Sequence, residues 1–263
     1  MHEYRVLALV IDLHCHILHG TDDGAETVED SLSMAKKAVK DGIHTIVATP
    51  HTLNGVYSNS VHEVNSRVVE LQDALTYEGI DLKVCPGADV HLCPRLNERI
   101  QNGDAGTVNN TGKYVLLEFP LQTIPPSVKG EIFDLKVNGI TPIITHPARH
   151  PVIQHDMDLL YELVCMGALC QITAMSITGD FGEDVMRCAE RLLKHRMVHV
   201  IASDAHSPEK RPPELSRAVD AAAETMGSVD EAEHMVKELP ARIIAGDAVE
   251  VPDPMPQKKR LWS

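Results

Sequence analysis

The chain has 263 residues, a net charge of −14 and a hydrophobic content of 43%, enough for one large domain with a sizeable core. The negative charge argues against a nucleic-acid-binding protein and against an anionic membrane surface as partner, because both would need a basic face. No apolar stretch approaches the roughly 20 residues of a membrane span, so we expect no membrane insertion. The apolar run at residues 5–11 leads straight into a polar motif without a small-residue cleavage site, which predicts a first strand rather than a signal peptide.

Strands and helices alternate along the chain. The predicted strands are almost wholly apolar and cover residues 5–13, 44–49, 82–90, 114–119, 141–145, 169–173 and 199–203. The predicted helices cover residues 27–41, 61–78, 128–138, 157–166, 183–196, 213–226 and 229–245. Apolar strands that are buried on both faces are typical of a parallel sheet or barrel, so the fold class is α/β.

The sequence contains no linker until its end, which predicts a single domain over residues 1–251. Residues 252–263 are Pro-rich and basic, and we expect a mobile tail. Its Lys258-Lys259-Arg260 run could dock a partner or could simply be solvated.

Six cysteines are present, without a Cys-x-x-Cys pair, and several lie in apolar runs. Their spacing fits neither a zinc knuckle nor a disulfide framework. Cysteine in an apolar run behaves as a small buried hydrophobe. Reduced cysteines predict a cytoplasmic protein.

Acidic and imidazole side chains recur where the predicted strands end. Residues two apart on a strand share a face, so Asp12, His14 and His16 should point one way while Leu13 and Cys15 point the other. Parallel barrels build their active sites at the carboxyl ends of their strands. The remaining candidates at or just past strand ends are Asp23, His51, Asp89, Glu118, His146, Asp204 and His206.

Together these side chains predict a metal centre. Burying so many ionisable groups is costly unless cations compensate. The mixture of imidazole and carboxylate without thiolate suits Mn, Fe or Zn and indicates a metal-dependent hydrolase. Asp12 shares the ligand face, and we expect it to accept a hydrogen bond that orients a histidine rather than to bind metal itself.

Two arginines follow these motifs. Arg149 lies three residues after His146, and Arg211 lies in the loop after His206. Guanidinium groups offer forked donors to phosphate oxygens, so the two could bind a phosphate monoester. Either could equally be a solvated loop residue.

A set of short motifs resembles a known family. It is similar to the PHP (polymerase and histidinol phosphatase) superfamily, and most similar to the bacterial metal-dependent protein-tyrosine phosphatases of capsule and exopolysaccharide clusters. The likeness runs from Ile11 to about Pro213. The motifs are Asp12-Leu13-His14-Cys15-His16, Gly20-Thr21-Asp22-Asp23-Gly24-Ala25, Ala48-Thr49-Pro50-His51 with Asn54-Gly55-Val56-Tyr57, Glu118-Phe119-Pro120, His146-Pro147-Ala148-Arg149 and Ser203-Asp204-Ala205-His206.

The resemblance implies a distorted TIM-like (β/α)7 barrel with three divalent metals, most often manganese. It implies one metal at His14, His16, Asp89 and Asp204, a second at Asp89, Glu118 and His146, and a third at Asp23, His51 and His206. It also implies that Arg149 and Arg211 hold the phosphate. The family usually has Glu where Asp89 stands, so the shorter side chain would need a closer backbone to bridge two metals.

The resemblance implies hydrolysis of protein phosphotyrosine, with a bacterial tyrosine kinase of polysaccharide export as the substrate. A water activated by metal would attack phosphorus, and a second water, Asp204 or His206 could protonate the leaving group. Two alternatives remain: a phosphatase of a small phosphoester such as histidinol phosphate, and a non-catalytic PHP scaffold that binds a partner.

Overall fold

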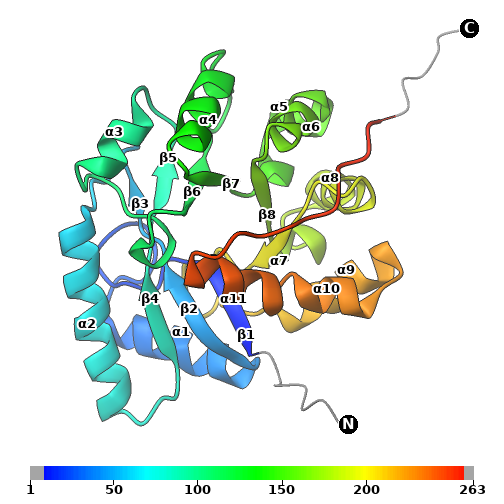
Figure 1. Cartoon of the computed structure of the whole chain (residues 1–263). Coiled ribbons are helices and arrows are strands. Elements are labelled where there is room, and N and C mark those ends of the chain that lie inside the picture. Colours follow the sequence, from blue (N-terminus) through cyan, green and yellow to red (C-terminus); the bar gives the residue numbers. More distant parts are fainter. Residues whose placement is uncertain (1–8, 258–263) are drawn as a thin grey trace, which may run out of the picture.

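The computed structural model describes residues 9–257, in which nine strands form a curled parallel sheet with helices packed around it (Figure 1). Three strands pair in the order β1 (Val10–Cys15), β2 (Ile43–Ala48) and β4 (Lys83–Pro86). Six more pair in the order β3 (His51–Thr52), β5 (Asp89–His91), β6 (Tyr114–Glu118), β7 (Thr141–Ile144), β8 (Leu169–Thr173) and β9 (Val200–Ala202).

Every strand pair is parallel, and one bridge between Cys15 and Ala205 links the end of β1 to the segment after β9. The predicted α/β class and parallel sheet are therefore confirmed. The predicted start of the first strand, residues 5–8, lies outside the described residues.

The strand predicted at residues 82–90 is wrong in one respect, because it divides into β4 and β5. Pro86 ends β4 and Pro50 follows β2, and proline has no N–H to continue a ladder. Asp89 resumes pairing through its N–H, which donates to Pro50 O at 3.2 Å. The break separates β5 from β4, and a similar break after β2 precedes β3, a short strand that the prediction did not contain.

The strict alternation predicted for β1 is also wrong at its end. Three steps from Asp12 to Cys15 lie opposite two steps from Ile46 to Ala48, so the strand contains a bulge. Leu13 and Cys15 consequently pack in different hydrophobic clusters, although a regular strand would place them on one face.

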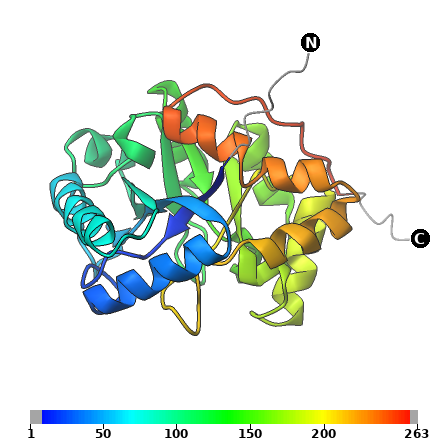
Figure 2. The ribbon, with the colours of Figure 1, turned by 90° about the horizontal axis from the view of Figure 1, so that it is seen from below.

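Most helices pack in one hydrophobic cluster around the sheet (Figure 2), whereas Leu239 and Ile243 of α11 pack in a second cluster with Ile11 and Leu13 of β1. The first helix is capped by Thr27 and Asp30, each bonding the other's backbone N–H. The short helices α3, α5, α7 and two 3₁₀ turns were not predicted. The helices are α1 (Val28–Lys40), α2 (Val61–Tyr77), α3 (Leu96–Gln101), α4 (Val128–Val137), α5 (Pro151–His155), α6 (Asp158–Cys165), α7 (Ala174–Ile177), α8 (Glu183–Lys194), α9 (Ser216–Met226), α10 (Val229–His234) and α11 (Glu238–Ala245), with 3₁₀ turns η1 (Val108–Asn110) and η2 (Pro147–Arg149).

The helix predicted at residues 229–245 divides into α10 and α11. The carbonyl of Met235 accepts a hydrogen bond from Ile201 N at 3.3 Å, and that of Val236 accepts one from Ile11 N at 2.8 Å. These carbonyls turn towards β9 and β1, so they cannot continue a helical ladder. The break fastens this end of the chain to the sheet.

After α11, the chain runs along the surface to α8 as an extended strap over residues 250–257 (Figure 1). Met255 N donates to His195 O at 2.8 Å, and Arg191 donates to the Gln257 side chain at 3.3 Å. The basic run Lys258–Arg260 lies outside the described residues. Between residues 9 and 257, no helix is long and apolar enough to cross a membrane.

Gly87, in the break between β4 and β5, provides a test of this packing. An added Cβ would lie 2.6 Å from Val47 Cγ1, too close for any real contact. We expect Gly87→Ala to lower the free energy of unfolding by about 1–3 kcal/mol in chemical denaturation. Gly130→Ala in α4 is the matched control, since its Cβ would meet nothing within 4 Å and helix propensity favours alanine. Equal stability of the two variants would contradict tight packing at the break.

Candidate metal centre

All nine predicted ligand side chains come together where the strands end. His14 and His16 stand at the end of β1, His51 opens β3, Asp89 opens β5 and Glu118 closes β6. The loops after β1, β7 and β9 contribute Asp23, His146, Asp204 and His206.

Two of these residues have backbones in the left-handed region, His146 at φ 37° and Asp204 at φ 52°. Non-glycine residues rarely adopt this conformation, and it is tolerated where the surrounding structure enforces it. The Asp204 backbone is held on β1, because its N–H donates to His14 O at 2.8 Å. The strain therefore serves to aim two side chains into the cluster.

The first group of donor atoms surrounds His14 and His16. Their Nε2 atoms lie 3.0 Å apart, and Asp204 Oδ1 lies 3.5 Å from each. Their Nδ1 atoms face oxygens of Gln171 and Asp22, at 3.1 and 2.6 Å, so both Nδ1 atoms donate to these oxygens and both Nε2 atoms point at each other. A cation between the two Nε2 atoms, either a proton or a metal ion, stabilises this arrangement.

The second group surrounds Asp89. Its Oδ2 lies 3.4 Å from His51 Nδ1, 3.6 Å from His14 Nε2 and 3.9 Å from His146 Nε2. Glu118 lies 3.5 Å from His51 and 3.6 Å from His146. Asp89 Oδ2 and His51 Nδ1 are buried without any hydrogen-bond partner, which suits atoms that bind metal.

Asp89 thus reaches histidines on both sides with a short side chain. Its backbone lies directly beside His51 in the pairing of β5 with β3. Its other carboxylate oxygen accepts a hydrogen bond from the Thr145 hydroxyl at 3.3 Å. The strand break after β4 therefore supplies the close backbone approach that a shorter side chain requires.

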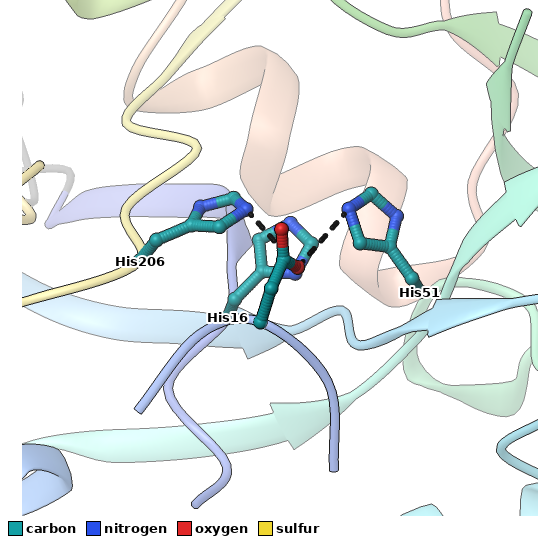
Figure 3. Close-up of side chains that lie close together, drawn as sticks. His16, His51 and His206 are labelled. Carbon is teal, nitrogen blue, oxygen red and sulfur yellow. Dashed lines mark ion pairs between the residues drawn. The ribbon is translucent and has the colours of Figure 1, made fainter. Parts of the chain in front are cut away.

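The third group consists of Asp23 and three histidines, His16, His51 and His206, whose rings converge (Figure 3). Asp23 Oδ1 lies 3.6 Å from His51 Nε2 and 3.7 Å from His206 Nε2. In each of the three groups, donor atoms from at least three residues lie within 4.8 Å of one another. This is the chemistry of a cluster of divalent cations.

The electrostatics of the site favour positive charge. Burial opposes a charge on His16, but the carboxylates of Asp22 and Asp204 outweigh it and raise its pKa to about 10. Burial lowers the pKa of His14 to about 4. Burial also disfavours the charged carboxylates, yet the neighbouring histidines hold the pKa values of Asp89 and Asp204 well below their usual range. The carboxylates are therefore ionised at neutral pH and form a field that attracts cations.

Two residues that orient the histidines were not singled out from the sequence. Asp22 Oδ2 accepts from His16 Nδ1 and, at 2.9 Å, from His51 N, while Gln171 in β8 binds His14. Partners of this kind fix the ring orientation of metal-binding histidines. A polar Gln171 inside an apolar strand and the acidic pair Asp22-Asp23 were the available signals.

Asp12 lies outside the three donor groups and accepts a hydrogen bond from a histidine, as expected, but from its backbone: His14 N donates to it at 3.3 Å. Its carboxylate also accepts from Ser203 N at 2.9 Å and from the Ser203 hydroxyl at 2.5 Å. Asp12 thereby fastens β1 to the segment that carries Asp204.

Both predicted arginines meet at the metal centre. Arg149 and Arg211 each place a guanidinium nitrogen 2.7 Å from Asp204 Oδ2. The ring of Phe181 faces both, with its centroid 4.8 and 5.7 Å from their Cζ atoms. Arg211 Nε is buried without a partner. Phe181 was not predicted, since its contacts arise only in the folded chain.

Asp22 allows the metal centre to be tested directly. We expect Asp22→Asn to weaken Mn²⁺ binding by roughly 10- to 100-fold in an equilibrium titration, because His16 would lose the carboxylate that orients its ring. Asp41→Asn, which alters a carboxylate that caps α9 through Leu215 N and Ser216 N, should leave the Mn²⁺ affinity unchanged. Unaltered affinity in Asp22→Asn would contradict the role of Asp22.

The chain is similar to proteins of one family along most of its length. The family model described as "Capsular polysaccharide synthesis, CpsB/CapC" matches residues 10–245. The tyrosine-protein phosphatase YwqE of Bacillus subtilis is 36% identical over 251 residues, 95% of this chain and 98% of YwqE. The tyrosine-protein phosphatase CpsB of Streptococcus pneumoniae is 27% identical over 89% of this chain and 98% of CpsB.

A solved structure extends the similarity to three dimensions. Its description is of YwqE from Bacillus subtilis and CpsB from Streptococcus pneumoniae as metal-dependent tyrosine phosphatases. The TM-score is 0.90 at 35% identity, covering 95% of this chain and all of the other. The chain therefore belongs to the CpsB/CapC family of capsular polysaccharide synthesis proteins.

Proposed function

We propose that this protein is a metal-dependent protein-tyrosine phosphatase that acts in capsular or exopolysaccharide synthesis. One observation carries the proposal: three groups of candidate metal-binding atoms lie next to two arginines, whose guanidinium groups both contact Asp204. The names of the relatives support the reaction and the family description supports the pathway. As substrate we propose a tyrosine-phosphorylated protein, in particular a bacterial tyrosine kinase that regulates polysaccharide synthesis. The buried thiols of Cys15, Cys85, Cys170 and Cys188 support a cytoplasmic location.

We propose three divalent ions, most plausibly manganese, with iron or zinc as alternatives. His14, His16, Asp89 and Asp204 would hold one, Asp89, Glu118 and His146 a second, and Asp23, His51 and His206 the third. The donor groups support this division in part: His14, His16 and Asp89 form one group, and Asp23, His51 and His206 belong to another that also includes His16. His51 joins Asp89 and Glu118 in the remaining group, within 3.5 Å of Glu118, so His51 lies between the second and third positions. Mixed imidazole and carboxylate ligands suit these metals.

We also propose that the curled sheet is a distorted (β/α)7 barrel with its active site at the carboxyl ends of the strands. The support is that β2 with β3, and β4 with β5, each follow one path interrupted by a short break. Counting each pair once leaves seven strands, which the Cys15–Ala205 bridge connects at the ends.

In the mechanism, bound metals would supply an activated water and a positive field at phosphorus. The side chains of the chain bind and orient the phosphoryl group. Arg149 and Arg211 together form a cationic wall beside the metal centre. Arg211 Nε is a buried donor without a partner among residues 9–257, so it is free to donate a hydrogen bond to a phosphoryl oxygen. Asp204 and His206 lie at the same place, with His206 Nδ1 kept 2.9 Å from Asp204 O. The ionised Asp204 can accept a proton but has none to give to the leaving oxygen, which leaves His206 of this pair as the donor we propose.

Apolar surface beside the centre favours an aromatic phosphoester on a protein over a small polar one. Leu121 is 73% exposed and lines a small hollow with Phe119, next to Glu118, His146 and Arg149. Val56 is 79% exposed, and its neighbour Tyr57 stacks near His51 with rings tilted by only 12°. Exposed apolar side chains of this kind mark contact sites for ligands or protein chains.

Metal dependence is the first test. We expect the protein to release phosphate from phosphotyrosine peptides in the presence of Mn²⁺, and we expect this activity to disappear after chelation of the metal. In the variant His14→Ala, kcat/KM should fall at least a hundredfold. His44→Ala is the matched control, because His44 is exposed on β2 and should keep full activity. Activity that survives chelation would overturn the proposal, and faster turnover of histidinol phosphate would favour the small-substrate alternative. If elemental analysis found no bound metal in the purified protein, the non-catalytic scaffold would be favoured.

Phe181 provides a second test. We expect Phe181→Leu to raise KM for a phosphotyrosine peptide roughly three- to tenfold while metal content stays the same, because both guanidinium groups lose the ring that holds them. Phe133→Leu, on the exposed face of α4, should leave KM unchanged. An unchanged KM in Phe181→Leu would contradict a role of this ring in placing the arginines.

A further inference from the structure

A second, larger cavity lies among the helices that follow β8. It has a volume of about 630 Å³, well within the range of small-molecule sites. Its floor is apolar and buried, formed by Leu193, Val198 and Leu239. Thr225, Met226 and Met235 form one wall, and the strap at residues 250–255 passes along the other side. The strap is held there by the Met255–His195 hydrogen bonds at 2.8 and 3.0 Å.

One buried polar atom in this cavity lacks a partner. His199 is 3% exposed and lines the cavity, and its Nε2 has no hydrogen-bond partner among residues 9–257. The other ring nitrogen, Nδ1, accepts a hydrogen bond from Cys170 N at 2.9 Å, so it carries no proton. The neutral ring must then carry its proton on Nε2. Burial lowers the pKa of His199 to about 4, so the ring is neutral at pH 7.

The cavity therefore presents one buried donor without a partner, His199 Nε2–H, next to an apolar surface that makes up half of its lining residues. Leaving a buried N–H unsatisfied costs about 1–3 kcal/mol, so an acceptor at this position would be favourable. The exposed rim carries both signs of charge, with Lys194 and Arg196 against Asp230, Glu231 and Glu250. This balance selects neither a cationic nor an anionic ligand.

We propose that this cavity is a binding site for a small neutral molecule with an apolar body and one hydrogen-bond acceptor, which His199 Nε2–H recognises. The apolar floor would cover the body of the ligand, and the methionines would adapt to its shape. The strap would close over it.

The site is separate from the metal centre. His199 immediately precedes β9, whereas Asp204 follows the end of that strand. Five residues of extended chain span roughly 16 Å, so the two lie at opposite ends of the sheet. Variants in the cavity can therefore be tested without altering the catalytic residues.

The experiment is a titration of the full chain, loaded with Mn²⁺, with prodan, a neutral naphthalene dye that has a single ketone oxygen. We expect saturable binding with blue-shifted emission. His199→Asn should bind roughly three- to tenfold more weakly, because asparagine Oδ1 can still accept from Cys170 N while the Nε2–H is gone. Thr225→Phe, which fills the cavity, should weaken binding at least tenfold.

Phosphotyrosine hydrolysis and the unfolding midpoint of each variant serve as folding controls and should match the parent. Val69→Phe adds a phenylalanine to the exposed face of α2 and should bind prodan as the parent does. Absence of saturable binding by the parent, or undiminished binding by Thr225→Phe, would overturn the site. Undiminished binding by His199→Asn alone would overturn recognition through Nε2, with Thr225→Phe still deciding the location.

Discussion

The structure depends on one constraint: carboxylates and imidazoles are buried close together at one end of the sheet, and their charges must be compensated there. Among residues 9–257, Asp89 Oδ2 lies near three histidines without a hydrogen-bond partner, and the Nε2 atoms of His14 and His16 face each other at 3.0 Å. Such an arrangement is costly without cations, because burial penalises each charge. Metal ions make the cluster favourable, and the surrounding shell keeps it in position: Asp22 and Gln171 fix two rings, and Asp12 ties β1 to the Asp204 segment.

The irregularities of the sheet serve this cluster. The bulge in β1 and the breaks after β2 and β4 interrupt regular pairing where ligands are needed. The second break brings the Asp89 backbone beside His51, so that the short aspartate side chain lies within 3.9 Å of three histidines. Bulges and breaks next to active sites re-aim side chains that a regular strand would point elsewhere. The left-handed backbones of His146 and Asp204 belong to the same pattern.

Asp204 connects the metal ligands to the groups that bind anions. One of its oxygens faces His14 and His16, and the other accepts from Arg149 and Arg211. Phe181 lies against both guanidinium groups, so the cationic wall is held from two sides. A phosphoryl group bound at this wall would lie next to the metal ligands, which is what phosphoryl transfer requires of positioning and charge. The His199 cavity lies at the other end of β9 and shares none of these residues.

The sequence by itself determined the α/β class and the parallel strands, and it named the nine candidate ligand residues that the fold brings together, because apolar periodicity and polar residues at strand ends are local signals. The sequence did not determine where every helix ends. The helix predicted at residues 229–245 divides in two because the carbonyls of Met235 and Val236 accept hydrogen bonds from distant strands. Only the tertiary structure decided what depends on contacts between remote segments. These contacts include the hydrogen bond that Asp12 accepts from Ser203. They also include the hydrogen bonds of Asp22 and Gln171 to histidine rings, and the packing of Phe181 against two arginines. The physical reason is that the composition and the periodic spacing of apolar residues indicate which side chains are buried. Hydrogen-bond partners, in contrast, depend on which loops the folded sheet brings together.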